Sequence, residues 1–234
     1  MTAGMVIAID GPSAAGKGTL ARRLAAHYGL PYLDTGLLYR AVGRLVLDAG
    51  GNPADPEAAL AAAKRLAPAD LDRADLRGPD ADEAASLVAA QPGVRAELLG
   101  FQRRFGDEHG AVLDGRDIGT VVFPEARVKL FVTASQRERA RRRFLDFEAK
   151  GIHRPFAEVE AELAARDERD TRRLAAPAKK ADDAIEIDTT GKDADAVFAA
   201  ALALIGERWP AQAGHPGAHG SHTASGQAGR RTAP

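Results

Sequence analysis

A glycine-rich run near the start of the sequence has the residue types that bind phosphate. It consists of Gly11, Pro12, Ser13, Ala14, Ala15, Gly16, Lys17, Gly18 and Thr19. Glycines let the backbone fold tightly around an anion, so that successive N–H groups and the start of the following helix point toward it. The lysine adds a positive charge at the β and γ phosphates of a nucleotide. The run therefore predicts a nucleotide phosphate-binding loop.

The residue after the lysine departs from the commonest form of such loops. That form places Ser or Thr there as a ligand for Mg²⁺, whereas this sequence has Gly18 and supplies the hydroxyl one position later, at Thr19. The departure argues against GTPases and motor-like ATPases. We expect Mg²⁺ to be held mainly through the nucleotide and water, because no cage of carboxylates is evident. We therefore assign no protein metal site.

A second group of polar residues follows an apolar segment at 30–33. Thr35 follows it closely, and Tyr39 and Arg40 come one helical turn later. Because residues four apart lie on one face of a helix, these three side chains could face one pocket. The group predicts a binding site for a second molecule.

A third group, Asp-Gly-Arg-Asp at 114–117, ends an apolar segment. Open parallel sheets place their ligands at the carboxyl ends of strands. Asp114 could orient water bound to Mg²⁺ or hold Arg116 in place, and the sequence favours neither role. Two acids and an arginine at this edge predict ligand contacts.

Arginines are concentrated in two helical segments of the second half. They are Arg137, Arg139, Arg141, Arg142 and Arg143, and then Arg166, Arg169, Arg172 and Arg173. An isolated run of this kind is usually a solvated helix face. A site that binds two phosphate-bearing molecules, however, needs positive charge. We expect the two segments to form a lid that closes about a hinge near Gly151 and excludes water.

The elements that must position these residues alternate along the chain. Apolar runs predict strands at 5–10, 30–33, 111–113, 128–132 and 184–187. Helical patterns lie at 17–28, 56–66, 82–90, 135–150 and 156–171, and 70–78 is ambiguous. Strands alternating with helices are typical of a doubly wound parallel sheet.

Length and composition exclude several classes of protein. The 234 residues suit one α/β domain with an insertion, and the absence of cysteine excludes disulfides and thiolate chemistry. A net charge of −1 argues against non-specific nucleic-acid binding. No leader or membrane-spanning run is evident, so we expect a cytoplasmic monomer without membrane partners. The polar tail at 210–234 should be disordered, and His215, His219 and His222 within it form no expected metal site.

Taken together, the motifs resemble those of bacterial cytidylate kinases. The resemblance rests on residues 9–19, 33–40 and 114–124, and it continues through 84–95, 137–143 and 166–173. The Gly-Lys-Gly-Thr form of the loop is similar to that of nucleoside monophosphate kinases. The matching motifs extend over residues 5 to about 206, which is nearly everything except the tail.

This resemblance implies both a fold and an activity. The fold is α/β, a three-layer P-loop kinase with a five-stranded parallel sheet. A single domain at 1–209 would carry an insertion that binds the nucleoside monophosphate (NMP) at about 48–95 and a helical lid at about 135–175. The activity is ATP-dependent phosphorylation of CMP and dCMP, with Mg²⁺.

The resemblance also implies roles for individual residues. Ser86, Arg95 and Asp117 would read the cytosine ring, with Arg173 nearby. Arg40 and Arg116 would hold the acceptor phosphate, and Arg166 and Asp170 would contact the ribose. Arg139, Arg142 and Arg143 would belong to the lid over ATP, and Lys17, Arg116, Arg139 and Arg143 would neutralise charge during transfer. A carboxylate that accepts from the exocyclic amine of cytosine favours CMP over UMP, because uracil reverses that pattern.

One departure concerns the insertion. The stretch between Arg40 and Ser86 is shorter than in the longer members of the family, and residues 70–82 are polar without strand alternation. A small sheet is therefore not expected there, and use of UMP stays open. The alternatives are a kinase acting on UMP, AMP, dTMP or a metabolite such as shikimate, and a regulatory module that senses or hydrolyses ATP.

Overall fold

A computed structural model describes residues 4–107 and 109–208 of the protein. The strands are β1 (Val6–Asp10), β2 (Tyr32–Asp34), β3 (Ala111–Gly115), β4 (Val128–Thr133) and β5 (Ile185–Asp188). The α-helices are α1 (Lys17–Tyr28), α2 (Thr35–Asp48), α3 (Pro56–Arg65), α4 (Pro79–Ala89), α5 (Pro92–Asp107), α6 (Gln136–Ala149), α7 (Phe156–Arg172) and α8 (Ala194–Arg208). The expected disordered tail at 210–234 lies outside the described residues.

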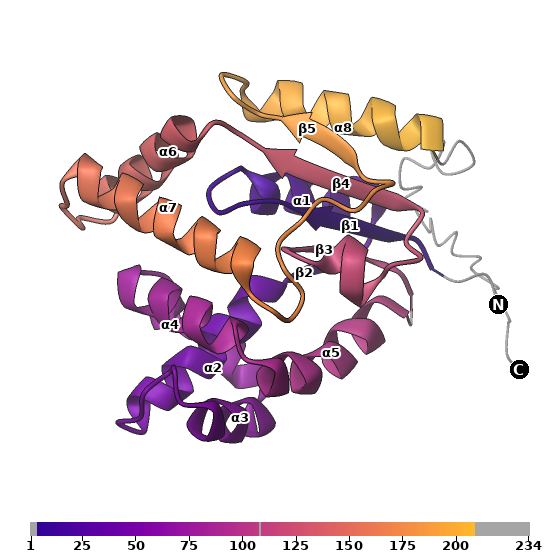
Figure 1. Cartoon of the computed structure of the whole chain (residues 1–234). Helices are drawn as coiled ribbons and strands as arrows, with labels where there is room; N and C mark the ends of the chain where they lie inside the picture. The colour runs from indigo at the N-terminus through magenta and orange to yellow at the C-terminus, as the bar shows by residue number, and fades with distance from the viewer. Residues whose placement is uncertain (1–3, 108, 209–234) are drawn as a thin grey trace, which may run out of the picture.

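The five strands form one parallel sheet in the order β2-β3-β1-β4-β5. The central strand β1 pairs on both sides, with Ile7 opposite Val112 of β3 and Val128 of β4. Every strand ends at the same edge of the sheet, where the loops that follow β1 and β3 meet (Figure 1). The five-stranded parallel sheet expected from the resemblance is thereby confirmed.

Alternation along β1 sends side chains to two separate cores. Ile7 and Ile9 pack with Leu24 of α1 and Ile205 of α8 on one face. Ala8 belongs to the core on the other face, which α2 and α5 cover. Because helices cover both faces, the inner strands β1 and β3 are apolar up to the aspartate near their carboxyl ends, as in other buried parallel sheets. The three layers are helices, sheet and helices.

The insertion between β2 and β3 is helical. Residues 48–95, all of which the structure describes, contain α3, α4, the end of α2 and the start of α5, with short 3₁₀ turns at Pro68–Asp72 and Ala74–Leu76. The small sheet that the sequence argued against is indeed not formed in this range. Helix α2 packs along α4 through close contact at Gly43, where an added Cβ would lie 2.8 Å from that of Ala84.

Two sequence-based boundaries differ from the structure. Helix α4 begins at Pro79, one turn before the expected start at residue 82, and Asp82 consequently lies inside the helix. Helix α5 was not expected as a separate element. Its buried positions, Val94, Leu98 and Gln102, follow a four-residue spacing that glycines and arginines interrupt.

The lid segment is a pair of helices, α6 and α7, that projects beyond the carboxyl end of β4 (Figure 1). The Ser135 hydroxyl accepts a bond from the Glu138 amide at 3.3 Å and so caps the start of α6. Gly151 has a φ of +71° in the turn between the helices, where a side chain would be strained. Within the described ranges, no helix is both long enough and apolar enough to span a membrane.

Candidate active site

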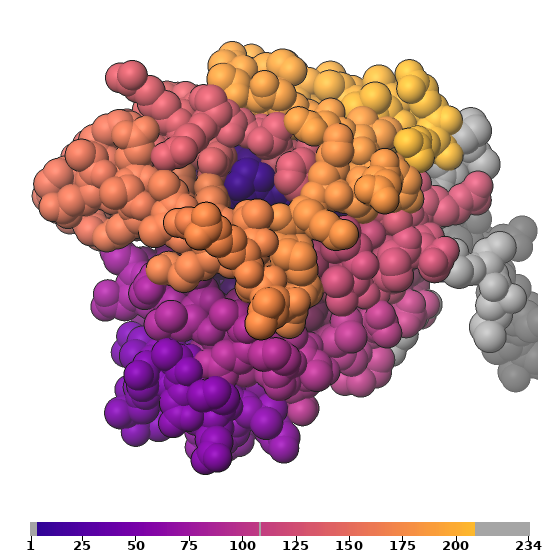
Figure 2. Space-filling model, in the orientation of Figure 1, coloured from indigo at the N-terminus to yellow at the C-terminus, as the bar shows by residue number. Residues whose placement is uncertain are grey.

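The phosphate loop lies at the bottom of a hollow between the lid and the sheet. In Figure 2 the indigo N-terminal segment is visible there, framed by α6, α7 and the segment before β5. A Cβ at Gly11 would clash with the carbonyl oxygen of Val132, and Gly16 has a φ of +95°. These two positions therefore require glycine, and they place the loop directly before the N-terminus of α1.

Lys17 begins α1 and is buried. Its ammonium donates to the Pro12 carbonyl at 2.7 Å, so the side chain folds back over the loop. Burial, together with repulsion by Arg116, lowers the pKa of Lys17 to about 7, and the attraction of Asp114 opposes that shift. The phosphates of a nucleotide would favour the charged form and restore the proton.

Asp114 ends β3 beside the loop. Its carboxylate accepts a bond from the Tyr32 hydroxyl at 2.8 Å, and its carbonyl accepts one from the Thr35 hydroxyl at 2.8 Å. Burial raises the pKa of Asp114 to about 6, with repulsion by Asp34 as the next cause. The two carboxylates put negative charge next to Lys17, where a cation or a metal-bound water would be stabilised.

A second buried acid positions the segment that follows β3. The Asp10 carboxylate accepts bonds from the amides of Ile118 and Gly119 at 2.8 and 2.7 Å. Burial raises the pKa of Asp10 to about 6, although both amides oppose the shift. Asp10 thereby ties the end of β1 to the turn that carries Arg116 and Asp117.

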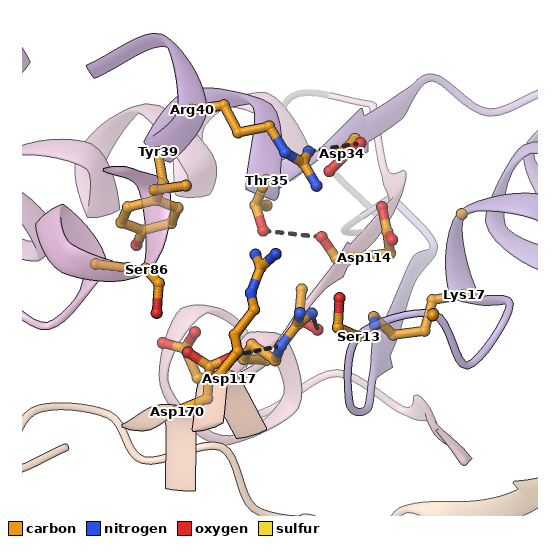
Figure 3. A pocket seen from close by; sticks show the side chains of 18 of the residues that line it. Ser13, Lys17, Asp34, Thr35, Tyr39, Arg40, Ser86, Asp114, Asp117 and Asp170 are labelled. Atoms are coloured by element: carbon orange, nitrogen blue, oxygen red, sulfur yellow. Dashed lines mark hydrogen bonds and ion pairs between the residues drawn. The ribbon is translucent and has the colours of Figure 1, made fainter. Parts of the chain in front are cut away.

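A cavity of about 320 Å³ extends from the phosphate loop to α5. All ten of the expected substrate contacts line it, namely Thr35, Tyr39, Arg40, Ser86, Arg95, Arg116, Asp117, Arg166, Asp170 and Arg173, together with Lys17 and Arg143. Figure 3 shows the labelled members pointing into one space from α1, α2, α4, the turn after β3 and α7. Residues more than 130 positions apart in the sequence thus meet in a single site.

The end of the cavity far from the phosphate loop holds a compact set of charges. Asp117 pairs with Arg95, and its other oxygen lies 3.6 Å from Arg173. The Arg95 guanidinium lies 5.4 Å from the centre of the Tyr39 ring. Buried charges require partners, and here the two arginines share the Asp117 carboxylate, so that the cluster presents both acceptors and donors.

The middle of the cavity contains further arginine–carboxylate pairs. Arg116 donates to Asp170 at 2.9 Å, and Arg40 lies 3.7 Å from Asp34. The arginines lower the pKa of Asp170 despite its burial, so this carboxylate is ionised. Phosphate oxygens are good partners for guanidinium groups, which can bind them in a bidentate manner.

The three arginines expected in the lid lie in different places. Arg143 lines the cavity. Arg139 is turned away from it and bonds Asp167 at 2.5 Å and the Ser13 carbonyl at 3.2 Å. Arg142 bonds the Thr189 carbonyl at 2.7 Å and lines a separate cavity.

That separate cavity has a volume of about 260 Å³ and lies on the outer side of the phosphate loop. Gly16, Thr19, Arg142, Thr189 and Val197 are among its lining residues. It adjoins the N-terminus of α1, so a nucleotide with its phosphates on the loop could place its base here. Thr189 is a contact that sequence reasoning missed, because it follows β5 far from any recognisable motif.

Two further residues join the lid to the insertion in ways that the sequence did not indicate, although Arg169 was among the expected lid arginines. Arg169 of α7 donates to the Ser86 hydroxyl at 3.2 Å and pairs with Glu83 at 2.6 Å, which joins the lid to the insertion. Asp82 was interpreted as the first residue of a helix, whereas it is buried one turn inside α4 among arginines. The available signal was the i, i+3, i+4 spacing of Asp82, Ala85 and Ser86, which places the three residues on one helix face.

No group of three or more His, Cys, Asp or Glu side chains among the described residues is arranged to hold a metal ion. Mg²⁺ prefers oxygen ligands and keeps several waters when it binds nucleotides. The Thr19 hydroxyl and the carboxylates of Asp34 and Asp114 are oxygen donors of the required kind beside the loop. The residues present therefore fit a Mg²⁺ ion held mainly by nucleotide and water.

The family model and similar curated proteins point to the same family. The family model described as cytidylate kinase matches residues 7–207. A cytidylate kinase of Acidiphilium cryptum is 63% identical over 205 residues, covering 88% of this chain and 97% of its own length. A cytidylate kinase of Granulibacter bethesdensis is 58% identical over 206 residues, covering 88% of this chain and 99% of its own.

Among solved structures, an uncharacterised protein of Eubacterium ventriosum matches with a TM-score of 0.52 at 16% identity, covering 87% of this chain and 98% of that protein. Identity at this level supports the fold alone. The matching family model, in contrast, includes every cavity-lining residue named above.

Proposed function

The chain belongs to the cytidylate kinase family, and we propose that it transfers the γ-phosphoryl group of ATP to the phosphate of CMP or dCMP, releasing ADP and CDP or dCDP. The observation that carries this proposal is the 320 Å³ cavity, which has the phosphate loop at one end and the cluster of Arg95, Asp117 and Arg173 at the other. A nucleoside monophosphate placed between them would present its phosphate to the loop.

The charge cluster suits cytosine. Its exocyclic amine is a donor and the adjacent ring nitrogen is an acceptor, so the Asp117 carboxylate can accept from the amine while Arg95 donates to the ring. Ser86 offers a hydroxyl on the same cavity wall. Uracil would place a carbonyl against the carboxylate, and a buried group left without a partner costs about 1–3 kcal/mol.

Transfer itself requires positioning and neutralisation of charge, with no covalent enzyme intermediate. Arg40 and Arg116 hold the acceptor phosphate, and Lys17 and Arg143 neutralise charge on the transferred group. An oxygen of the acceptor phosphate attacks the γ-phosphorus in line as the bond to the bridging oxygen breaks, so that ADP leaves. A bound Mg²⁺ ion would supply further neutralisation, and the Thr19 hydroxyl and the Asp114 carboxylate would help to hold it.

We propose that the helical insertion at about 48–95 closes over the acceptor and that the lid at about 135–175 closes over ATP, both within one domain at 1–209. The hollow between lid and sheet supports this proposal (Figure 2). So does the turn at Gly151, whose positive φ favours glycine over residues with a side chain. Closure excludes water, which suppresses hydrolysis of ATP. Arg142 and Arg139 would then act from the lid side of the phosphate loop.

We also propose that the protein acts as a cytoplasmic monomer, without nucleic-acid or membrane partners. The near-zero net charge and the lack of cysteine support this proposal. Light scattering on the full chain with saturating CMP should give the mass of one chain, and a stable dimer would contradict it.

The experiment that tests the activity is ADP release with ATP and Mg²⁺, offering CMP, dCMP, UMP, AMP, dTMP and no acceptor in parallel. We expect rapid turnover with CMP and dCMP and little with the others. Comparable turnover with UMP would contradict the assigned base contacts. ADP release that is independent of any acceptor would replace the kinase with an ATPase.

A further inference from the structure

Asp82 is a buried carboxylate between the insertion and the lid, and it is 8% exposed. Its Oδ1 accepts a bond from Nε of Arg40 at 3.0 Å and lies 3.2 Å from Nη1 of Arg166, and its Oδ2 pairs with Arg143. The three arginines come from α2, α7 and α6. One carboxylate on α4 therefore joins three helices that carry the cationic side of the site.

Without the Asp82 carboxylate, the three buried arginines would repel one another with no opposite charge at their centre. Burial lowers the pKa of both Arg143 and Arg166 to about 10, and repulsion from neighbouring arginines adds to each shift. An ionised carboxylate at the centre offsets that repulsion, since a buried charge is tolerated only with partners. The arrangement thus holds three like charges close together at one point.

Asp82 contacts the arginines from the side opposite the substrate cavity. It borders a second cavity of about 620 Å³ between α4 and the lid helices, and it is not among the residues that line the 320 Å³ substrate cavity. Arg143 and Arg166 border both cavities. Arg40 contacts Asp82 through Nε, and its Nη1 lies 3.7 Å from Asp34, another residue that lines the substrate cavity. The carboxylate can therefore orient these side chains without occupying the phosphate position.

We propose that Asp82 is a positioning residue for phosphoryl transfer. Its carboxylate aims Arg40 at the acceptor phosphate and docks the lid arginines, Arg143 and Arg166, against the insertion at the same point. Asp82 touches no substrate and acts only through the three arginines. This inference rests on the proposed kinase function, because it assigns these arginines to substrate phosphates.

The proposal has a specific kinetic consequence. Arginine side chains lose considerable rotamer freedom when they are held in one geometry, and misplacement by about 1 Å can cost about a hundredfold in rate. Without Asp82, Arg40 would bind the acceptor phosphate less well and the lid arginines would reach the transferred group less often. The KM for CMP should therefore rise as kcat falls.

The test compares wild type with Asp82→Asn, Asp82→Glu and the control Asp80→Asn in the ADP-release assay. Asp80 is exposed on the same first turn of α4, so its substitution removes the same charge without touching the cluster. We expect Asp82→Asn to lose about 10- to 100-fold in kcat/KM for CMP through both constants. Asp82→Glu should recover part of that loss, and Asp80→Asn should match wild type.

Circular dichroism and thermal unfolding of each variant separate positioning from folding. A lower kcat with unchanged KM and a lower Tm would mean that Asp82 only stabilises the fold, and a lower KM would mean that it competes with phosphate. Either result, or unchanged kinetics, overturns the proposal. If Asp82→Asn does not fold, the Asp82→Glu variant decides the question. A KM for CMP that does not rise in Asp82→Glu then overturns the proposal. A wild type inactive on CMP would instead refute the proposed function.

Discussion

The two ends of the substrate cavity are built in different ways. The phosphate loop is a contiguous stretch, residues 11–19, whose backbone and single lysine would face the phosphates of a bound nucleotide. The opposite end takes Tyr39, Arg95, Asp117 and Arg173 from four separate elements, and each charge there already has a partner in the protein. The first end is a local device and the second is a product of tertiary packing.

This difference assigns different tasks to the two ends. Backbone donors and a lysine bind any phosphate chain, so the loop cannot distinguish one acceptor base from another. Side chains that are paired within the protein must give up a partner to contact the substrate. Only a base with matching donors and acceptors replaces the lost hydrogen bonds. We therefore expect substitutions in the loop to slow all reactions equally and substitutions at the far end to change the choice of acceptor.

The largest effect should come from Lys17→Met. Removing the one loop side chain that neutralises the transferred phosphoryl should lower kcat/KM by about a thousandfold, as for the loss of a single preorganised donor in other active sites. ADP release with CMP and with UMP measures it, and both should fall by the same factor. The control is Lys64→Met, an exposed lysine at the end of α3. A change in the CMP to UMP ratio would break the comparison.

Asp114→Asn should separate stability from activity at the boundary between the two ends. The pKa of Asp114 is about 6 in the folded protein and 3.8 ordinarily, so the protonated form is favoured by folding. That stability is present below pH 4 and is lost as pH rises through 6. Asparagine keeps the neutral form, so the variant should gain about 2 kcal/mol over wild type between pH 4.5 and pH 7.5.

Urea unfolding of the nucleotide-free proteins at both pH values measures this gain. The same variant should lose turnover, because it lacks a negative charge beside Lys17. A gain that is identical at the two pH values would show that Asp114 does not titrate as described.

A smaller effect should follow from Ser86→Ala at the far end. Loss of one neutral hydrogen bond costs about 1 kcal/mol, which corresponds to about fivefold in kcat/KM for CMP. Phosphoryl transfer at Lys17 should be unaffected, because Ser86 is expected to contact only the base. Turnover with UMP, which does not match the cytosine contacts, should therefore change less. Equal losses with both acceptors would place Ser86 outside the base site.

Sequence reasoning succeeded where function lies in contiguous residues. The phosphate loop could be predicted in full, because backbone geometry in residues 11–19 depends on glycines that are visible in the sequence. The parallel sheet could also be predicted, since most strands lie in short, mainly apolar segments that alternate with helical patterns. The ten substrate contacts, including those at the far end, were predicted through the resemblance, and the structure brings all ten into one cavity.

The rest could not be predicted, because it depends on distant partners. Asp82 was interpreted as a helix start, since nothing near it indicates that Arg143 and Arg166 come to lie against it. Helix α5 was missed because Gly93, Gly100 and Gly106 interrupt its apolar pattern. One of these glycines is required by packing, as a Cβ at Gly106 would lie 2.5 Å from the Phe123 ring.

The division of labour between the two ends is tested most directly by the ratio of kcat/KM for CMP to that for UMP, measured in wild type and in Asp117→Ala. Asp117 is the carboxylate that Arg95 and Arg173 share. Any loss from leaving those arginines unpaired affects both acceptors, so the ratio isolates the contact with the base. We expect wild type to favour CMP and Asp117→Ala to reduce that ratio by about 5- to 150-fold. An unchanged ratio would contradict the assignment of acceptor choice to this end of the cavity.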